Sequence, residues 1–286
     1  MVQFGEIIEA TVTDENGSNY FAQSNGFTYM IPKKSIEDTL EKKEVVEGLI
    51  YQDKDGTDIL QIELPDIRPG IFGWGKVIQS IPSLGIFVDV GLINKDIVVS
   101  LDDLPEDDRK WPRYGDKLYL TYRVDDKNRF WGVLAQAEDY KNIKRKAPSR
   151  MMNQEVSATV INDKGVGVQA LSVEGFEIFV HQSEMDHKLR VGELVQLRII
   201  HVHDDGTLNG SSKPRAFEAL DDDSEMIYAV LSRTAEKFLP LHDKSDPEEI
   251  KEYLGLSKSQ FKRAVGRLMK NNRVRQEKNK GIFIIE

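Results

Sequence analysis

The chain of 286 residues is longer than one hydrophobic core usually organises, it contains no cysteine, and it carries a formal net charge of −9. Disulfides and thiolate metal sites are therefore excluded, which fits a cytoplasmic protein, and the negative charge argues against indiscriminate coating of nucleic acid. No run reaches the roughly 18 apolar residues that a membrane helix needs, and the first residues lack the layout of a signal peptide.

The charge is distributed unevenly along the chain. Residues 1–64 contain 5 basic and 13 acidic residues. In contrast, residues 257–281 contain nine basic residues and a single acidic one, Glu277. Any contact with a polyanion such as nucleic acid is therefore expected towards the C-terminal half.

Residues 1–64 predict three strands, a short helix and two further strands. Strand-forming residues dominate GEIIEATV, NYFAQ and GFTYMIP, and a polar helix is expected over 35–43. Two more strands follow in GLIYQDKDGTDILQIEL, where Asp55-Gly56 is a two-residue hairpin signal. This order matches a five-stranded oligonucleotide/oligosaccharide-binding (OB) barrel.

Residues 65–140 repeat this order, beginning with the hairpin FGWGKVIQSIPSLGIFVDVGL. Ile86, Val88 and Val90 alternate with Phe87, so the period of two places Phe87 on the opposite face from the three aliphatic residues. If the aliphatic residues fill a barrel, Phe87 points outward, where an aromatic ring can serve as a stacking platform for a base. The alternative is an ordinary hairpin in which Phe87 belongs to the core.

The spacing G-x-V-x-x-I followed by G-x-F-V in this hairpin resembles the first hairpin of the S1-type RNA-binding domain, which is an OB barrel. The resemblance implies that Phe87 occupies the aromatic position of the second strand. It also implies that Asp125 and Arg129, around the turn before RFWGVLA, lie near the RNA path.

Residues 141–150, KNIKRKAPSR, predict a basic linker, because the segment contains Pro148 and lacks apolar periodicity. Its five cations are either solvated or add contacts to phosphates.

Residues 151–214 predict a third barrel, with strand candidates in SATVIN, GVGVQAL and GFEIFVHQSEM. The last of these resembles the third-strand signature G-x-h-x-h-V-H-x-S-E of the S1 domain. The resemblance implies an RNA-binding aromatic surface made of Phe176, Phe179 and His181. Phe179 is equally compatible with a place in the core.

Both of these barrels depart from the S1 pattern. In the second barrel, Leu84 replaces a common aromatic residue, and Val98-Val99 stands where a Val-His pair is frequent. In the third barrel, Lys164 and Gly167 occupy positions where aromatic residues are expected. The residues that we expect to compensate in the second barrel are Arg123 and Trp131.

Residues 215–286 change to a helical period, with Ile227, Val230, Leu231 and Phe238 on one predicted helix. A second helix is expected between an N-cap at Asp246 and a stop at Gly255, and a third after a capping box at Ser257 and Gln260. Two short strands, RVRQ and GIFIIE, complete the pattern of a winged helix-turn-helix.

The third predicted helix and the wing carry the nine basic residues noted above. Nine cations with one acidic residue, on the element that helix-turn-helix proteins insert into a groove, favour contact with nucleic acid over a merely solvated face. The pattern does not distinguish RNA from DNA. The cations are Lys258, Lys262, Arg263, Arg267, Lys270, Arg273, Arg275, Lys278 and Lys280.

The sequence thus predicts a multidomain protein, mainly β with an α+β C-terminal domain. Its parts are S1-like barrels at 1–64, 65–140 and 151–214, a linker at 141–150 and a winged helix at 215–286. In this order they resemble the conserved virulence factor B family of bacterial RNA-binding regulators along essentially the whole chain. The resemblance implies binding of single-stranded RNA and post-transcriptional regulation.

Enzymatic and metal-dependent functions are not indicated by the sequence. His201, His203 and Asp204 lack a convincing further ligand, and the motifs of phosphate loops, hydrolase elbows and zinc proteases are absent. We therefore expect no cofactor and no catalytic residue. Two alternatives stay open: a DNA-binding transcriptional regulator and an accessory factor in RNA processing. The acidic first barrel is a candidate site for a protein partner.

Overall fold

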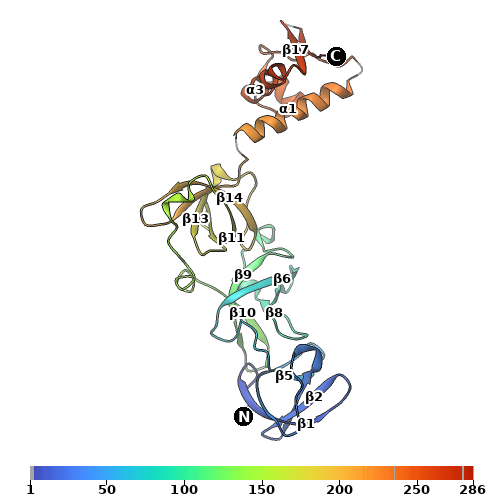
Figure 1. The fold of residues 1–286 in the computed structure, drawn as a ribbon, viewed down its shortest axis with the longest axis vertical. Helices are drawn as coiled ribbons and strands as arrows, with labels where there is room; N and C mark the ends of the chain where they lie inside the picture. The colour runs from blue at the N-terminus through green and yellow to red at the C-terminus, as the bar shows by residue number, and fades with distance from the viewer. Residues whose placement is uncertain (1–2, 215, 235, 279, 286) are drawn as a thin grey trace. The chain divides into compact units, whose positions relative to one another are not determined.

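The computed structural model describes residues 3–214, 216–234, 236–278 and 280–285, apart from the side chains of residues 216–222 (Figure 1). The chain forms two compact units, Met1–Ser212 and Lys213–Glu286. Three closed five-stranded barrels make up the first unit, and the described part of the second holds three helices and a three-stranded sheet. The predicted fold class is confirmed.

The first barrel, blue in Figure 1, has the strand order β1-β2-β3-β5-β4, in which β3 and β5 are parallel. The prediction of a helix over residues 35–43 is wrong. A single 3-10 turn (Lys33–Ser35) is followed by irregular chain and a turn at residues 42–43, where Lys43 has a φ of 77° and donates its N–H to Val12 O of the barrel. The strands are β1 (Ile7–Glu15), β2 (Asn19–Ser24), β3 (Phe27–Pro32), β4 (Val45–Gln52) and β5 (Asp58–Gln61).

The connection between β4 and β5 differs from the predicted two-residue hairpin. It spans residues 53–57, because Gln52 pairs directly with Asp58. The carboxylate of Asp53 holds this loop by accepting hydrogen bonds from the N–H groups of Asp55 and Thr57, each at 2.9 Å. Gly56 adopts a φ of 81°, a conformation that favours glycine.

The second barrel has the equivalent order β6-β7-β8-β10-β9. Ile86 and Val88 are fully buried in its core, whereas Phe87 between them is partly exposed, which confirms the predicted orientation of Phe87. The elements are β6 (Gly73–Ile81), β7 (Gly85–Asp89), β8 (Ile97–Val99), the 3-10 turns η2 (Leu101–Asp103) and η3 (Asp108–Lys110), β9 (Lys117–Val124) and β10 (Phe130–Leu134).

The third barrel repeats the same topology, as β11-β12-β13-β15-β14. Residues 141–150 are folded against it instead of forming a free linker: Arg145 N donates to Gly175 O at 2.8 Å, and Ala147 is buried in the barrel core. The elements are η4 (Ser149–Met151), β11 (Glu155–Asp163), β12 (Gly167–Ser172), β13 (Glu177–His181), η5 (Gln182–Glu184), β14 (Leu194–Val202) and β15 (Leu208–Ser211).

The second unit has the winged-helix order predicted from the sequence, with one additional strand. Asp246 caps α2, Gly255 ends it with a φ of 70°, and Ser257 and Gln260 form the predicted capping box of α3. Phe238 does not belong to the first helix: it lies in β16 and pairs with Phe283. The elements are α1 (Ala216–Arg233), β16 (Phe238–Leu239), α2 (Pro247–Leu254), α3 (Lys258–Lys270), β17 (Val274–Glu277) and β18 (Gly281–Ile284).

Candidate nucleic-acid interface

Each barrel has a β-bulge at the same place in its first strand, so the three barrels can be compared residue by residue. The ladder shifts between Val12 and Asp14, between Val77 and Gln79, and between Val160 and Asn162. Following the cross-strand partners from the residue after each bulge gives one residue per strand on the outer face. We call these five residues the outer row of a barrel. The rows are Asp14, Phe21, Met30, Ile59 and Tyr51 in the first barrel, Gln79, Phe87, Val98, Trp131 and Arg123 in the second, and Asn162, Gln169, Phe179, Asn209 and His201 in the third.

The outer row of the second barrel brings together three of the residues predicted from the sequence. Val98 separates Phe87 from Trp131, and Trp131 lies opposite Arg123 on the neighbouring strand. Phe87 and Trp131 are both partly exposed, and Arg123 is exposed. The row therefore offers two aromatic rings and one cation on a single face, which suits stacked bases beside a phosphate.

Asp125 holds the end of this row in place. Its carboxylate accepts hydrogen bonds from Trp131 Nε1 at 3.0 Å, from Arg129 Nε at 2.8 Å and from two backbone N–H groups of its own loop. The hydrogen bond from Trp131, with help from the loop N–H groups and Arg129, lowers the pKa of Asp125 well below its usual range. The guanidinium of Arg129 lies 5.2 Å from the ring centroid of Trp131, a cation–π contact. Asp125 thus positions Trp131 and Arg129.

The outer row of the third barrel is more polar. Gln169 takes the position of Phe87, because it pairs with Asn162 after the bulge as Phe87 pairs with Gln79. Phe179 is partly exposed between Gln169 and Asn209, while Ile178 and Val180 beside it in sequence are fully buried. Phe179 therefore lies on the outer face and not in the core.

Histidine side chains lie near Phe179 on the outer face of the third barrel. His181 lies two residues further along β13, on the same face, with its ring centroid 6.5 Å from that of Phe179. His203 bonds Asn209 of the row through Nε2 at 3.2 Å and packs edge-on against His201 at 4.6 Å. From the sequence, His201 and His203 were considered only as metal ligands. The place of His201 and Asn209 on the row depends on strand register and on the bulge, for which the sequence has no distinctive local signal.

Phe176 does not join this surface. It precedes β13, packs against the hydrophobic core of the third barrel, and pairs through its backbone with Arg145 of the segment 141–150. Its backbone N–H is capped by the hydroxyl of Ser172 at 3.1 Å. The aromatic surface of the third barrel thus consists of Phe179 with its neighbouring histidines.

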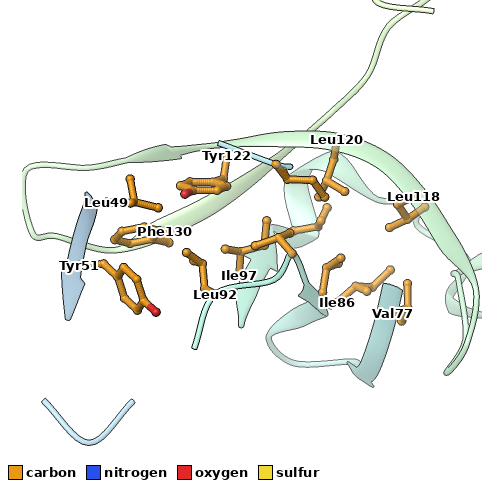
Figure 2. Packing of buried hydrophobic residues seen from close by; sticks show 14 of the residues in the cluster. Leu49, Tyr51, Val77, Ile86, Leu92, Ile97, Leu118, Leu120, Tyr122 and Phe130 are labelled. Atoms are coloured by element: carbon orange, nitrogen blue, oxygen red, sulfur yellow. The ribbon is translucent and has the colours of Figure 1, made fainter. Parts of the chain in front are cut away.

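Part of the outer row of the first barrel packs against the second barrel, whereas Asp14 at its other end is exposed and Phe21 is partly exposed. Tyr51 and Ile59 are almost completely buried and share a hydrophobic cluster with Phe130 and Leu92. Figure 2 shows Leu49 and Tyr51 facing Phe130, and the rings of Tyr51 and Phe130 meet edge to face at 6.3 Å. The part of the row formed by Tyr51, Ile59 and Met30 is therefore an interface between barrels, whereas the other two barrels leave the equivalent positions at least partly exposed.

Polar contacts fix this interface between the first two barrels. The Tyr51 hydroxyl accepts a hydrogen bond from Ile93 N at 2.6 Å and donates to Gln61 Oε1 at 2.8 Å. Asn94 Nδ2 donates to Asp53 Oδ2 at 2.9 Å. The Tyr51–Gln61 bond lies within the first barrel, whereas the bonds from Ile93 and Asn94 come from the second barrel and give the interface a defined geometry.

In the second unit, the cations of α3 and the wing fall into two groups. Lys262, Arg263 and Lys270 of α3 are exposed on the side away from its buried stripe, which consists of Phe261, Ala264, Val265 and Leu268. Neither these three cations nor Lys278 of the wing forms an ion pair with another residue in the described part of the chain. They are available for phosphates.

The remaining predicted cations have partners or are less exposed. Lys258 donates to the carbonyl of Ser245 at 2.7 Å, and Arg267 is partly buried. Arg273 pairs with Glu225 and stacks 3.8 Å from the ring centroid of Tyr228. Glu277 binds Arg275 at 3.0 Å and Lys280 at 3.1 Å, and its hydrogen bond with Lys280 lowers its pKa.

Neither a metal centre nor a membrane span is found in the residues that the structure describes. Within them, His, Asp and Glu side chains do not gather in threes or more in a way that could hold a metal ion. None of the helices in this described part combines the length and apolarity needed to cross a bilayer.

The three barrels and the last domain each match a known family. Residues 4–60 match the S1 domain, 72–133 the family described as "CvfB first S1-like domain", 140–214 "Virulence regulatory factor CvfB, second domain", and 225–282 "CvfB-like winged helix domain". The fold and the outer rows therefore define a protein assembled from two kinds of nucleic-acid-binding domain.

Relatives of full length agree with these matches. The chain is 35% identical over 280 residues to "Conserved virulence factor B" of Staphylococcus epidermidis (strain ATCC 12228 / FDA PCI 1200), covering 96% of this chain and 93% of the relative. It is 32% identical over 273 residues to "Uncharacterized protein YitL" of Bacillus subtilis (strain 168), covering 96% and 91%. The chain belongs to the conserved virulence factor B family.

A solved structure extends the likeness to the whole fold. It is described as a multidomain protein with nucleic acid binding domains from Streptococcus pneumoniae TIGR4. The two chains are 39% identical and superpose with a TM-score of 0.71. The match covers 99% of this chain and 98% of the solved one.

Proposed function

We propose that this protein binds single-stranded RNA and acts as a post-transcriptional regulator. The observation that carries the proposal is the pair of open outer rows on the second and third barrels, each with a partly exposed phenylalanine beside polar side chains. A ring on a strand stacks on any base and contributes about 1–3 kcal/mol per base. Such rows suit an unpaired strand, whose bases are free to stack, better than a closed duplex.

The first barrel contributes indirectly in this proposal. Tyr51 and Ile59 of its outer row are buried in the cluster shared with the second barrel. Its segment of the chain has 13 acidic residues against 5 basic ones, an excess of negative charge that repels phosphates. Its role is to support the second barrel, and its exposed acidic surface is open to a protein partner.

The winged helix supplies electrostatic attraction. Lys262, Arg263 and Lys270 on α3, with Lys278 on the wing, are exposed cations that can contact phosphates and release counterions. The same feature favours a second candidate function, a DNA-binding transcriptional regulator, because helix-turn-helix proteins place such a helix in the major groove.

A competition experiment separates the two functions. Labelled oligouridylate is bound to the full chain at a fixed salt concentration and challenged with unlabelled RNA or with duplex DNA. We expect RNA to compete more strongly and the affinity to fall as salt rises. Stronger competition by duplex DNA at matched salt would favour the transcriptional regulator.

We also propose that the protein binds RNA without cleaving it. Labelled RNA incubated with the full chain and Mg²⁺ or Mn²⁺ is expected to stay intact. Cleavage that is lost on substituting one Asp or His would instead identify a nuclease or RNA-processing factor. A regulator that only binds transcripts accounts for the virulence role that the names of the staphylococcal relatives imply, without requiring catalysis.

A further inference from the structure

A cavity of about 250 Å³ lies between the second and third barrels. One wall comes from β6 and β9 of the second barrel, and another from β11 and β12 of the third. The end of β10 and the chain that follows it complete the lining, with Gln136, Tyr140 and Lys144. None of these cavity residues belongs to the outer row of the second barrel.

Three aromatic side chains line this cavity. The ring centroid of Tyr119 lies 5.2 Å from that of Trp74 and 5.1 Å from that of Tyr140. Tyr119 and Tyr140 are buried, whereas 38% of Trp74 is exposed although it is a large apolar side chain. An exposed indole beside two fixed rings is a surface on which a further planar ring can stack.

Amide side chains border the aromatic wall. Asn162 and Gln169 both line the cavity, and they are also the first two members of the outer row of the third barrel. The next member of that row is Phe179, directly opposite Gln169. A strand lying on Phe179 therefore has a continuous path into the cavity. Asn162 can both donate and accept hydrogen bonds, as the edges of bases do, and Gln169, whose Nε2 donates to Glu177, can still accept through Oε1.

Lysines complete the lining. Lys144 pairs with Glu177 at 2.7 Å and Lys110 with Asp163 at 3.8 Å, and both pairs reach the third barrel. Lys117 is exposed and has no ion pair within the residues that the structure describes. The cavity thus combines stacking surfaces, amide groups and a cation suited to a phosphate.

We propose that this cavity binds one unstacked base of the RNA strand that runs along the outer row of the third barrel. A cavity of about 150 Å³ is sufficient for a benzene ring, so the present volume accommodates the larger ring of a base. The inference rests on the proposed RNA binding and adds a site to it: Trp74 stacks on the base, and Asn162 and Gln169 bond its edge.

The first test compares two exposed aromatic residues of the second barrel. Trp74→Ala in the full chain is expected to weaken binding of a uridine 12-mer about 5- to 150-fold, because stacking of one base is lost. Tyr114→Ala is the matched control: Tyr114 is 75% exposed and lies outside the cavity lining, so its loss should leave the affinity unchanged. Trp74→Phe should retain most of the binding.

A second test does not depend on removing Trp74. The 12-mer carrying 4-thiouridine is photocrosslinked to the unaltered full chain, and we expect crosslinked peptides containing Trp74, Tyr119 or Tyr140. If Trp74→Ala lowers the unfolding midpoint, Asn162→Leu at the exposed border replaces it in the binding assay, with a loss of affinity expected.

The outcomes separate the cavity from the proposed function. Normal affinity of Trp74→Ala or, where that variant is destabilised, of Asn162→Leu, together with crosslinks confined to peptides outside the cavity, would overturn the base site and leave RNA binding intact. A failure of the unaltered chain to bind the 12-mer would overturn the proposed function and the base site with it.

Discussion

Tyr51 and Arg123 occupy the same position in two barrels of the same topology, yet Tyr51 is completely buried and Arg123 is exposed. Both residues are the last member of an outer row. The difference arises because Tyr51 packs against Phe130 of the second barrel, while the side chain of Arg123 is exposed. One barrel fold thus presents the same face to a protein neighbour in one case and leaves it open in the other.

Substituting these two residues should have opposite effects. Tyr51→Phe removes the hydroxyl that bonds Ile93 N and Gln61, and we expect it to lower the free energy of unfolding by about 1 kcal/mol without changing RNA affinity. Arg123→Gln should leave stability unchanged but reduce RNA affinity and the salt slope, by about 0.7 for one lost phosphate contact. Thermal unfolding and salt titrations of both variants provide the measurements. A loss of RNA affinity in Tyr51→Phe would show that the first barrel takes part in binding.

A second pair of substitutions distinguishes the two faces of β7. Phe87→Ala should weaken RNA binding by about 1–3 kcal/mol with little change in salt slope or unfolding midpoint, since the ring is partly exposed. Ile86→Ala should destabilise the barrel by about 2–5 kcal/mol, because Ile86 is fully buried. Affinity and denaturant unfolding are compared for the two variants. If Phe87→Ala unfolds the barrel instead, Phe87 is a core residue.

The strands and helices of this protein were largely predictable because their signals are local. The alternation around Phe87 and the capping box of Ser257 and Gln260 lie within a few residues of the elements that they define. The error at Phe238 has the opposite origin. Its helical spacing fits the sequence, but β16 forms through pairing with β18, about 45 residues away, and no local pattern reports that contact.

The site was less predictable, for two physical reasons. The outer rows depend on strand register, and the bulges at Ile78 and Ile161 shift that register without a distinctive residue type. The burial of Tyr51 depends on a neighbouring barrel, so its own sequence environment gives no sign of it. The exposure of single residues such as Phe87 could therefore be predicted, but the arrangement of Phe87 and Trp131 in one row, and the burial of Tyr51 and Ile59 in the row of the first barrel, could not.

The surroundings of His187 predict a pH-dependent stability of the third barrel. Its Nδ1 lies 2.8 Å from Asp186 and its Nε2 2.9 Å from Glu193, and the hydrogen bond with Glu193 is the main reason that the pKa of His187 is raised. A raised pKa in the folded state adds stability below the ordinary histidine value of about 6.5, and this stability is lost as pH rises through the folded pKa.

We therefore expect the unfolding midpoint of the full chain to fall as pH rises from about 6 to about 8, and we expect His187→Gln to reduce that dependence. The effect should be small, since the imidazole is half exposed and solvent screens its ion pairs. Thermal unfolding at several pH values measures it. An identical pH profile in His187→Gln and in the unaltered chain would assign the dependence to another group.

The exposed cations of α3 lead to the last prediction. Lys262→Glu, Arg263→Glu and Lys270→Glu combined should weaken RNA binding at low salt and flatten the salt slope by about 0.7 for each phosphate contact that is lost. The fold should survive, because these side chains point away from the stripe formed by Phe261, Ala264, Val265 and Leu268. Salt titrations of the variant and the unaltered chain provide the comparison.

The matched control lies in the wing of the same domain. Arg275→Gln with Lys280→Gln also removes positive charge, but both side chains are already paired with Glu277, so their loss should change the salt slope less than the three substitutions in α3. If the α3 variant keeps both the affinity and the slope of the unaltered chain, α3 does not contact phosphates. RNA binding would then depend on the outer rows of the second and third barrels, and the cations of α3 would be free to serve an acidic protein partner.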